Sequence, residues 1–146
     1  MSDRFKPYAA VLLFLIKDDS ILLIRRFNTG WADGSYTVPS GHIDGNESLT
    51  VAAAREAKEE VDVTVRPKDL EFVHVMHRMH PETMHEYIDS FFVAREWKGE
   101  PKVNEPDKCD EVKWFSLDNL PENMIPFVRD VIMSYKSGKR FSEVGW

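Results

Sequence analysis

Apolar positions along the chain gather in short runs that turn-forming residues interrupt, and this pattern predicts a β-sheet accompanied by helices. Runs rich in β-branched and aromatic residues predict strands at 8–17, 21–26, 36–38, 70–79, 86–95 and 111–115. The first two runs flank a polar turn, Asp18-Asp19-Ser20, and therefore predict a β-hairpin in a buried sheet. The fourth and fifth runs, joined around Pro81, predict a second antiparallel pair.

Two further segments have the composition of helices. Residues 48–61 are rich in Ala and Glu and contain neither Gly nor Pro, with Asn46 or Ser48 as the predicted N-cap. Residues 121–136 predict a closing helix, whereas 138–146 carries no clear pattern. Because no repeat or linker interrupts the chain, we expect one α+β domain over residues 1–146, with a mixed sheet between helices.

Composition narrows the classes of protein to consider. The 146 residues, 42% of them hydrophobic, suffice for one compact core. A formal net charge of −6 disfavours nucleic-acid binding, which depends on basic surface. The longest apolar run, 8–16, is too short to cross a bilayer, and residues 1–7 lack the zones of a secretory signal. We therefore expect a cytoplasmic protein without a membrane or nucleic-acid partner, either a monomer or a homodimer.

The cysteine and histidine residues give little indication of a catalytic or metal-binding role. The single cysteine, Cys109, cannot form an internal disulfide, and its acidic neighbours would raise the pKa of a thiol, so we expect a structural residue. Four histidines, at 74, 77, 80 and 85, suggest zinc, but strand alternation sends His74 and His77 to opposite faces. Zinc is therefore disfavoured.

The predicted helix at 48–61 carries the chain's clearest chemical signal. Glu56, Glu59 and Glu60 are spaced i, i+3 and i+4, which places three carboxylates on one helical face. Such crowding of negative charge is costly unless a cation lies among them, and Mg²⁺ prefers hard oxygen ligands of this kind. Arg55 precedes Glu59 by one turn and can orient Glu59 or the more distant Glu47. A Glu-rich helix is more often only a solvated surface, so this cluster needs further support.

That support comes from the residues before the helix. The spacing of six positions resembles the Nudix box, and these positions are Gly41, Glu47, Arg55, Glu56, Glu59 and Glu60. Val38-Pro39-Ser40-Gly41 is also similar to the Leu-Pro-Gly-Gly that leads into the family's box, and the similarity extends to Trp114-Phe115 and Leu120-Pro121. The resemblance implies the Nudix α/β/α sandwich. It also implies Mg²⁺, with Mn²⁺ as a substitute, held by Glu56, Glu59, Glu60 and the carbonyl of Gly41.

Two positions depart from the family's pattern. Asp62 stands where the family has a glycine just after the helix, a place that often needs the left-handed conformation, which Asp tolerates. Ser40 replaces the first glycine of the turn before the box and adds a side chain near the expected substrate. Neither departure removes a ligand, so the sequence still predicts an active enzyme.

The resemblance implies hydrolysis of a nucleoside diphosphate linked to another group. Water attacks one phosphorus while metal ions stabilise the developing charge. Glu59 is our first choice for the general base, because box glutamates serve in some family members. An acid from a later loop serves in others, and among the loop acids here Glu105 ranks first.

Substrate contacts are predicted outside the box. Arg25 and Arg26 end a strand near the expected site and are candidates for phosphate binding, although strand-end arginines are as often only solvated. Trp31 and Tyr36 are candidates for stacking a base, although packing explains an aromatic residue more often.

The nucleotide itself stays open at the level of sequence. The subgroup marks for ADP-ribose and dinucleoside polyphosphate enzymes are out of place, since Pro81 and Tyr87 come late. The short length resembles MutT-type enzymes, which favours a nucleoside triphosphate, normal or oxidised, cleaved to a monophosphate and pyrophosphate. The alternatives are an ADP-ribose or nucleotide-sugar pyrophosphatase and a Nudix domain that binds a nucleotide without hydrolysing it.

Overall fold

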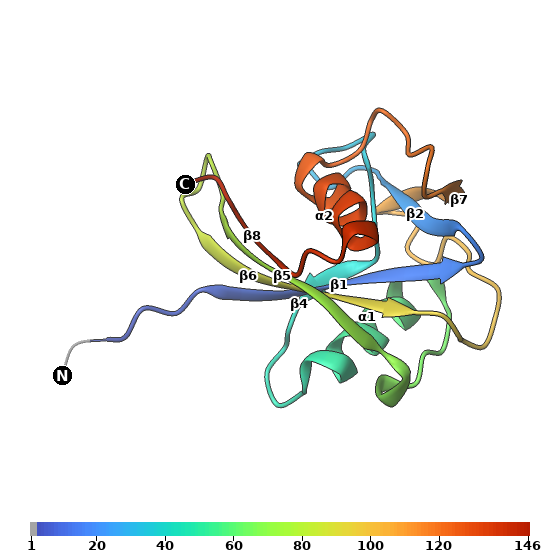
Figure 1. Ribbon diagram of the computed structural model, residues 1–146, viewed down its shortest axis with the longest axis horizontal. Helices are drawn as coiled ribbons and strands as arrows, with labels where there is room; N and C mark the ends of the chain where they lie inside the picture. The colour runs from blue at the N-terminus through green and yellow to red at the C-terminus, as the bar shows by residue number, and fades with distance from the viewer. Residues whose placement is uncertain (1–2) are drawn as a thin grey trace.

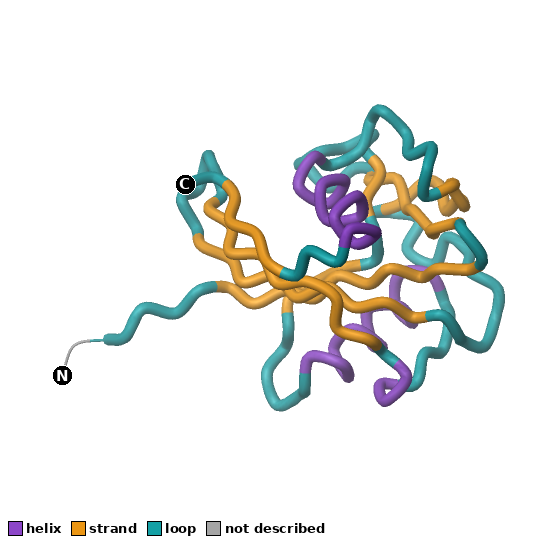
Figure 2. The backbone as a smooth tube through the Cα atoms, viewed as in Figure 1, coloured by secondary structure: helices purple, strands orange, loops and turns teal. Residues whose placement is uncertain are grey.

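In the computed structural model, which describes residues 3–146, one mixed β-sheet lies between two helices (Figure 1). Figure 2 shows the two long helices on opposite sides of the strands. The expected sandwich, with a mixed sheet between helices, is therefore confirmed. Residues 1 and 2, which belong to the segment tested above for a secretory signal, lie outside the described part.

The described residues form an eight-stranded sheet and two α-helices. The strands, in chain order, are β1 Tyr8–Lys17, β2 Ser20–Arg26, β3 Tyr36–Thr37, β4 Ser40–His42, β5 Glu71–Met79, β6 Glu86–Ala94, β7 Cys109–Ser116 and β8 Phe141–Val144. The helices are α1 Leu49–Val61 and α2 Pro126–Ser137, with a short 3₁₀ turn at Pro67–Asp69. The main path of the sheet runs β3-β2-β1-β6-β5-β8, with β4 paired to β1 and β7 paired to β2.

Strand β1 is buried on both faces and divides the core in two. Leu12 and Phe14 face the cluster that contains Val128 of α2, whereas Leu13 and Leu15 face the cluster around the alanines of α1. A strand with helices on both sides reads as a continuous apolar run, which is the pattern that residues 8–17 show. The parallel pairing of β1 with β6 extends this centre of the sheet.

Both ends of helix α1 follow from local sequence. Ser48 is the N-cap, and its hydroxyl accepts a hydrogen bond from the Val51 amide at 3.3 Å. Asp62 caps the C-terminus in the left-handed conformation, with φ 58° and ψ 40°. Its carboxylate pairs with Lys58 at 2.8 Å, which adds a side-chain contact that glycine would lack.

Three elements differ from the predictions. Helix α2 begins at Pro126 instead of residue 121, because proline suits the first turn of a helix and residues 121–125 form an irregular connection. Strand β8 gives regular structure to the 138–146 segment by pairing in parallel with β5. Strand β4 was not predicted, and it pairs Gly41 with Val11 of β1.

No helix within residues 3–146 has both the length and the apolar character needed to cross a membrane.

The N-cap gives a test of how α1 is held. Replacing Ser48 with Ala removes the acceptor for the Val51 amide, so Ser48→Ala should lower the free energy of unfolding by about 1 kcal/mol, measured by urea denaturation. Ser48→Thr keeps the hydroxyl and should unfold within a few tenths of a kcal/mol of the unmodified chain. Equal loss in both variants would show that the hydroxyl does not cap the helix.

Candidate active site

The three carboxylates of the box helix share one face of α1 through their spacing, and two of them, Glu56 and Glu60, lie against β4. The side chain of Glu56 is buried, with 8% of the residue exposed. Glu60 accepts a hydrogen bond from the Ser40 amide at 2.8 Å, which ties α1 to the start of β4. Glu59 extends outward, and half of its side chain is exposed. We call Glu56, Glu59 and Glu60 the carboxylate face.

Gly41 lies directly against this face. A β-carbon added at Gly41 would overlap the Glu56 carboxylate, because even the farther oxygen, Oε2, would lie only 2.7 Å from it. No side chain larger than hydrogen fits there while Glu56 keeps its position. The glycine of the box is therefore required by close packing between the backbone of β4 and a buried carboxylate.

Arg55 joins the acidic residues around the box. Its guanidinium makes two hydrogen bonds to Glu47, at 2.8 and 3.1 Å, and contacts Glu56 at 2.9 Å and Glu59 at 3.3 Å. It also donates to the carbonyl of His42 at 3.2 Å. Bonding by Arg55 lowers the pKa of Glu47, and the pKa of Arg55 is raised chiefly by its hydrogen bonds to Glu47. The structure thus brings Arg55 and Glu47 together as predicted.

Electrostatics of the carboxylate face favour a positive partner. Burial raises the pKa of Glu56 to about 7 against the opposing pull of Arg55, and burial also raises the pKa of Glu60 well above its usual value. Carboxyl groups held in this way are costly to ionise unless a cation compensates. Within residues 3–146 no group of three or more His, Cys, Asp or Glu side chains is arranged so that it could hold a metal ion as the side chains lie. The carboxylate oxygens of the carboxylate face nevertheless suit a hard divalent cation such as Mg²⁺. We call the packing of Gly41 against Glu56, which fixes one of these carboxylates, the glycine cradle.

Glu105 lies on the loop before β7, beside the carboxylate face. It lines a small cavity of about 210 Å³ together with Arg26, Thr29 and Glu60. Its negative charge contributes to the raised pKa of both Glu56 and Glu60. The structure therefore brings this predicted loop acid near the box helix.

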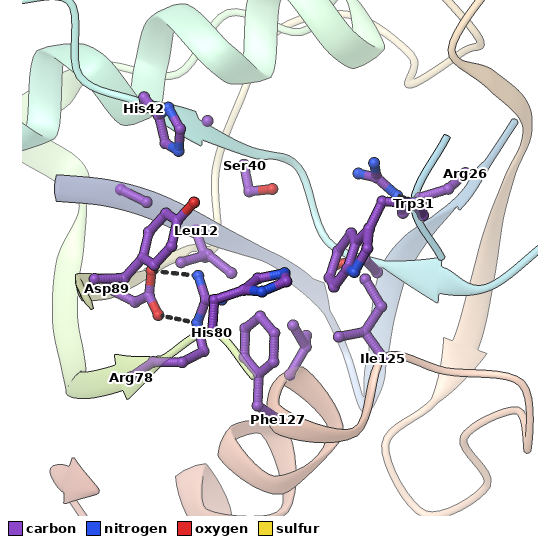
Figure 3. Close-up of a pocket in the computed structure, with 15 residues that line it drawn as sticks. Leu12, Arg26, Trp31, Ser40, His42, Arg78, His80, Asp89, Ile125 and Phe127 are labelled. Atoms are coloured by element: carbon purple, nitrogen blue, oxygen red, sulfur yellow. Dashed lines mark hydrogen bonds and ion pairs between the residues drawn. The ribbon is translucent and has the colours of Figure 1, made fainter. Parts of the chain in front are cut away.

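A larger cavity opens on the far side of β4 (Figure 3). This main cavity has a volume of about 410 Å³, which lies within the range of small-molecule sites. Gly41, Ser40 and His42 form one wall, with Arg26 and Trp31 at one end. Arg26 donates to the Trp31 carbonyl at 2.7 Å, and its guanidinium lies 5.1 Å from the centre of the Trp31 ring.

The structure does not bring Arg25 or Tyr36 into either of these cavities. Arg25 points to the opposite face of β2 from Arg26 and pairs with Asp110 at 2.7 Å. Tyr36 is buried in the core, and its hydroxyl donates to Glu111 at 2.6 Å. Arg25 therefore forms an ion pair and Tyr36 packs in the core, and neither side chain lines a cavity where a substrate contact was expected.

Several lining residues of the main cavity were missed by sequence reasoning. Arg78 on β5 pairs with Asp89 on β6 at 2.7 Å, and only 1% of the Asp89 side chain is exposed. Tyr87 and Phe127 enclose the same guanidinium, and His80 lies beside it. The sequence did contain one sign of this pair. Asp89 lies inside the apolar run 86–95, and a buried aspartate must find a hydrogen-bonding or charged partner.

Cys109 and His74 have structural environments. Burial raises the pKa of the Cys109 thiol, which leaves a weak nucleophile at neutral pH, as expected for a structural cysteine. His74 is fully buried and contacts the Ser142 hydroxyl at 2.7 Å and the Lys139 carbonyl at 3.0 Å. Its ring therefore fastens the C-terminal segment to β5.

A model of the NUDIX domain matches residues 6–135. The chain belongs to the Nudix hydrolase family. A solved relative of this Nudix protein is a MutT NUDIX hydrolase from Burkholderia pseudomallei. It is 26% identical, with a TM-score of 0.81 over 88% of this chain and 98% of that one.

Curated relatives of this Nudix hydrolase have two different activities in their names. The NAD-capped RNA hydrolase NudC of Stutzerimonas stutzeri is 28% identical over 81% of this chain, which spans 39% of that protein. The ADP-ribose pyrophosphatase of Methanocaldococcus jannaschii is 32% identical over 80% of this chain and 66% of that protein. The chain thus spans about two fifths of the NudC protein and two thirds of the ADP-ribose pyrophosphatase.

The close approach of Gly41 to Glu56 leads to a prediction about metal binding. Gly41→Ala should displace the Glu56 carboxylate and weaken Mn²⁺ binding at least about tenfold, because a ligand geometry held by packing tolerates little movement. Isothermal titration calorimetry with MnCl₂ measures this.

The matched control is Gly138→Ala, at a left-handed helix cap where an added β-carbon meets nothing within 4 Å. This variant should lose about 1 kcal/mol of stability, because alanine disfavours the left-handed conformation that Gly138 adopts, and should keep its Mn²⁺ affinity. If Gly41→Ala bound Mn²⁺ as tightly as the control, the proposed cradle would be wrong.

Proposed function

We propose that this Nudix hydrolase cleaves a nucleoside triphosphate, normal or oxidised, to a nucleoside monophosphate and pyrophosphate in the presence of Mg²⁺. One observation carries the proposal. Gly41 faces the Glu56 carboxylate and also borders the main cavity of about 410 Å³. A bound nucleotide can therefore place its phosphates at the carboxylate face and its base in the main cavity, across three residues of β4.

Each element of the box has a proposed part in this reaction. Glu56, Glu59, Glu60 and the Gly41 carbonyl would hold the divalent cation, which supplies charge stabilisation to the phosphates and acidifies bound water. Arg55, fixed by Glu47, orients Glu56 and Glu59 through its hydrogen bonds. Arg26 borders both cavities and is placed to meet phosphate oxygens between them.

The general base is proposed among two glutamates. Glu59 is the more exposed member of the carboxylate face and is held at one edge by Arg55, so it is accessible to an incoming water. Glu105 approaches from the loop before β7 and lies with Glu60 in the small cavity. Glu59 is the first choice and Glu105 the second, and single substitutions of each distinguish them by their effects on the pH dependence of kcat.

A second substrate class is supported by the relative from Methanocaldococcus jannaschii, whose name is ADP-ribose pyrophosphatase and which is 32% identical. In that case the same machinery would cleave ADP-ribose or a nucleotide sugar. The chemistry at the carboxylate face would be the same. Only the group beyond the second phosphate would differ.

A nucleotide panel with MgCl₂ tests the proposal. We expect pyrophosphate and a monophosphate from one or more nucleoside triphosphates, measured by ion-exchange chromatography of the products. Release of AMP from ADP-ribose without turnover of triphosphates would establish the second class instead. Tight binding of a nucleotide that the protein never hydrolyses would show a binding module and contradict the catalytic proposal.

The ligand assignment has its own test in Glu60→Gln. The amide oxygen can still accept from the Ser40 amide, so the fold should persist, whereas loss of the negative charge should lower kcat by about 10²- to 10³-fold. Exposed Glu71 on β5 gives the control, because Glu71→Gln removes the same charge away from the cavities. Rates within twofold of the unmodified enzyme for Glu60→Gln would remove Glu60 from the ligand set.

A further inference from the structure

The main cavity contains an arginine held in a fixed orientation. The guanidinium carbon of Arg78 lies 4.2 Å from the ring centre of Tyr87 and 4.2 Å from that of Phe127. Its Nε and Nη2 donate to the two carboxylate oxygens of Asp89, at 2.7 and 3.3 Å. Figure 3 shows these two contacts on one side of the cavity, with Ser40 and His42 of β4 opposite. Two rings and one carboxylate thus fix the plane and the rotation of this side chain.

Part of this guanidinium remains available for a ligand. An arginine carries five N–H donors, and Asp89 takes only one from Nε and one from Nη2. Among the described residues, Nη1 of Arg78 has no hydrogen-bond partner. Every fully buried side-chain nitrogen or oxygen in that part of the chain does have a partner, so Nη1 cannot be fully buried. Nη1 is therefore accessible, and Arg78 lines the main cavity. The end of the fork, Nη1 with the second hydrogen of Nη2, presents adjacent donors.

The charge state of the pair selects the kind of group that binds there. Asp89 is almost fully buried and neutralises Arg78, so the pair offers hydrogen-bond donors without net positive charge. A phosphate at this point would meet the nearby Asp89 carboxylate as well as Arg78. A neutral acceptor avoids that repulsion and still satisfies the free donors. The aromatic and apolar lining, which includes Trp31, Phe127 and Leu12, also suits a base more than an anion.

We propose that Arg78 is the residue that selects the base, and that it prefers a purine with a carbonyl at position 6. Such a base presents O6 and N7 as adjacent acceptors, which match two donors of one guanidinium. Adenine places an amino group at position 6, so a donor would face a donor. Asp89 positions Arg78 by holding its other edge. This inference rests on the proposed function, because it assumes that the main cavity receives the base of the nucleotide.

Binding of nucleoside monophosphates tests the preference without requiring turnover. Isothermal titration calorimetry on the full chain should show GMP and IMP binding at least about tenfold more tightly than AMP, since a good bidentate contact separates bases by that factor or more. IMP isolates the carbonyl, because it lacks the amino group of GMP at position 2. Equal or tighter binding of AMP, or no binding of any monophosphate, would overturn the proposal.

Two variants of the Arg78–Asp89 pair test whether Arg78 causes the preference for GMP over AMP. Arg78→Lys keeps a positive charge beside Asp89 but cannot present two parallel donors, so the preference for GMP over AMP should fall to about threefold or less. The double variant Arg78→Met with Asp89→Asn removes both charges together and should also lose the preference while remaining folded, as checked by circular dichroism. Retention of the full preference in both variants would contradict the assignment.

The control and a competition complete the experiment. Arg66 forms an exposed pair with Asp69 at 2.7 Å, outside the main cavity, and Arg66→Lys should leave the GMP preference unchanged. Added inorganic phosphate should not change the ratio of the GMP and AMP affinities. If phosphate abolished the preference, Arg78 would be an anion site and the inference would fail.

The two proposals fail in different ways. Hydrolysis of all triphosphates at similar kcat/KM, together with equal GMP and AMP binding, would sustain the proposed function and reject base selection by Arg78. Selective GMP binding without hydrolysis of any nucleotide would sustain base selection and reject the proposed function. Arg78→Lys should raise KM for GTP with little change in kcat, which is the signature of lost binding rather than lost chemistry.

Discussion

The candidate active site depends on one close contact, the approach of the Gly41 backbone to the buried Glu56 carboxylate. The contact requires a residue without a β-carbon, and it requires β4 to pair with β1 so that the backbone cannot move away. Glu60 strengthens the same junction by accepting from the Ser40 amide. These two contacts fix helix α1 against strand β4, and the positions of the Glu56 and Glu60 carboxylates follow from this packing.

This arrangement leaves the negative charge of the carboxylate face incompletely compensated. Burial opposes ionisation of Glu56 and Glu60, whereas Arg55 and the Ser40 amide favour it. Neither the single arginine nor the single amide compensates the whole carboxylate face, because Arg55 is already shared with Glu47. A divalent cation would compensate this negative charge, so the burial that opposes ionisation of Glu56 and Glu60 would also favour the binding of the proposed metal ion.

Sequence predicted the parts of this molecule that are local, and the misses have physical reasons. The box, the helix α1 with its Ser48 cap, and the left-handed Asp62 all lie in one continuous segment, residues 41–62. Tyr36 and Arg25 were misplaced because stacking or phosphate contact and structural packing use the same residue types. Strands β4 and β8 were missed because they have only three and four residues, too few to show an apolar pattern, and they form by pairing with β1 and β5.

The same distinction explains why the reaction can be inferred from one segment while the nucleotide cannot. The proposed cation site uses three carboxylates spaced i, i+3 and i+4 on one helix, and this fixed spacing is visible in the sequence. Base selection needs only donors aimed into a cavity, and here they arise where β5 and β6 place Arg78 beside Asp89, eleven residues apart. No spacing rule marks such a pair, since any two paired strands can create it. If Arg78 selects the base as proposed, specificity can change through two residues of the sheet while the carboxylate face stays the same.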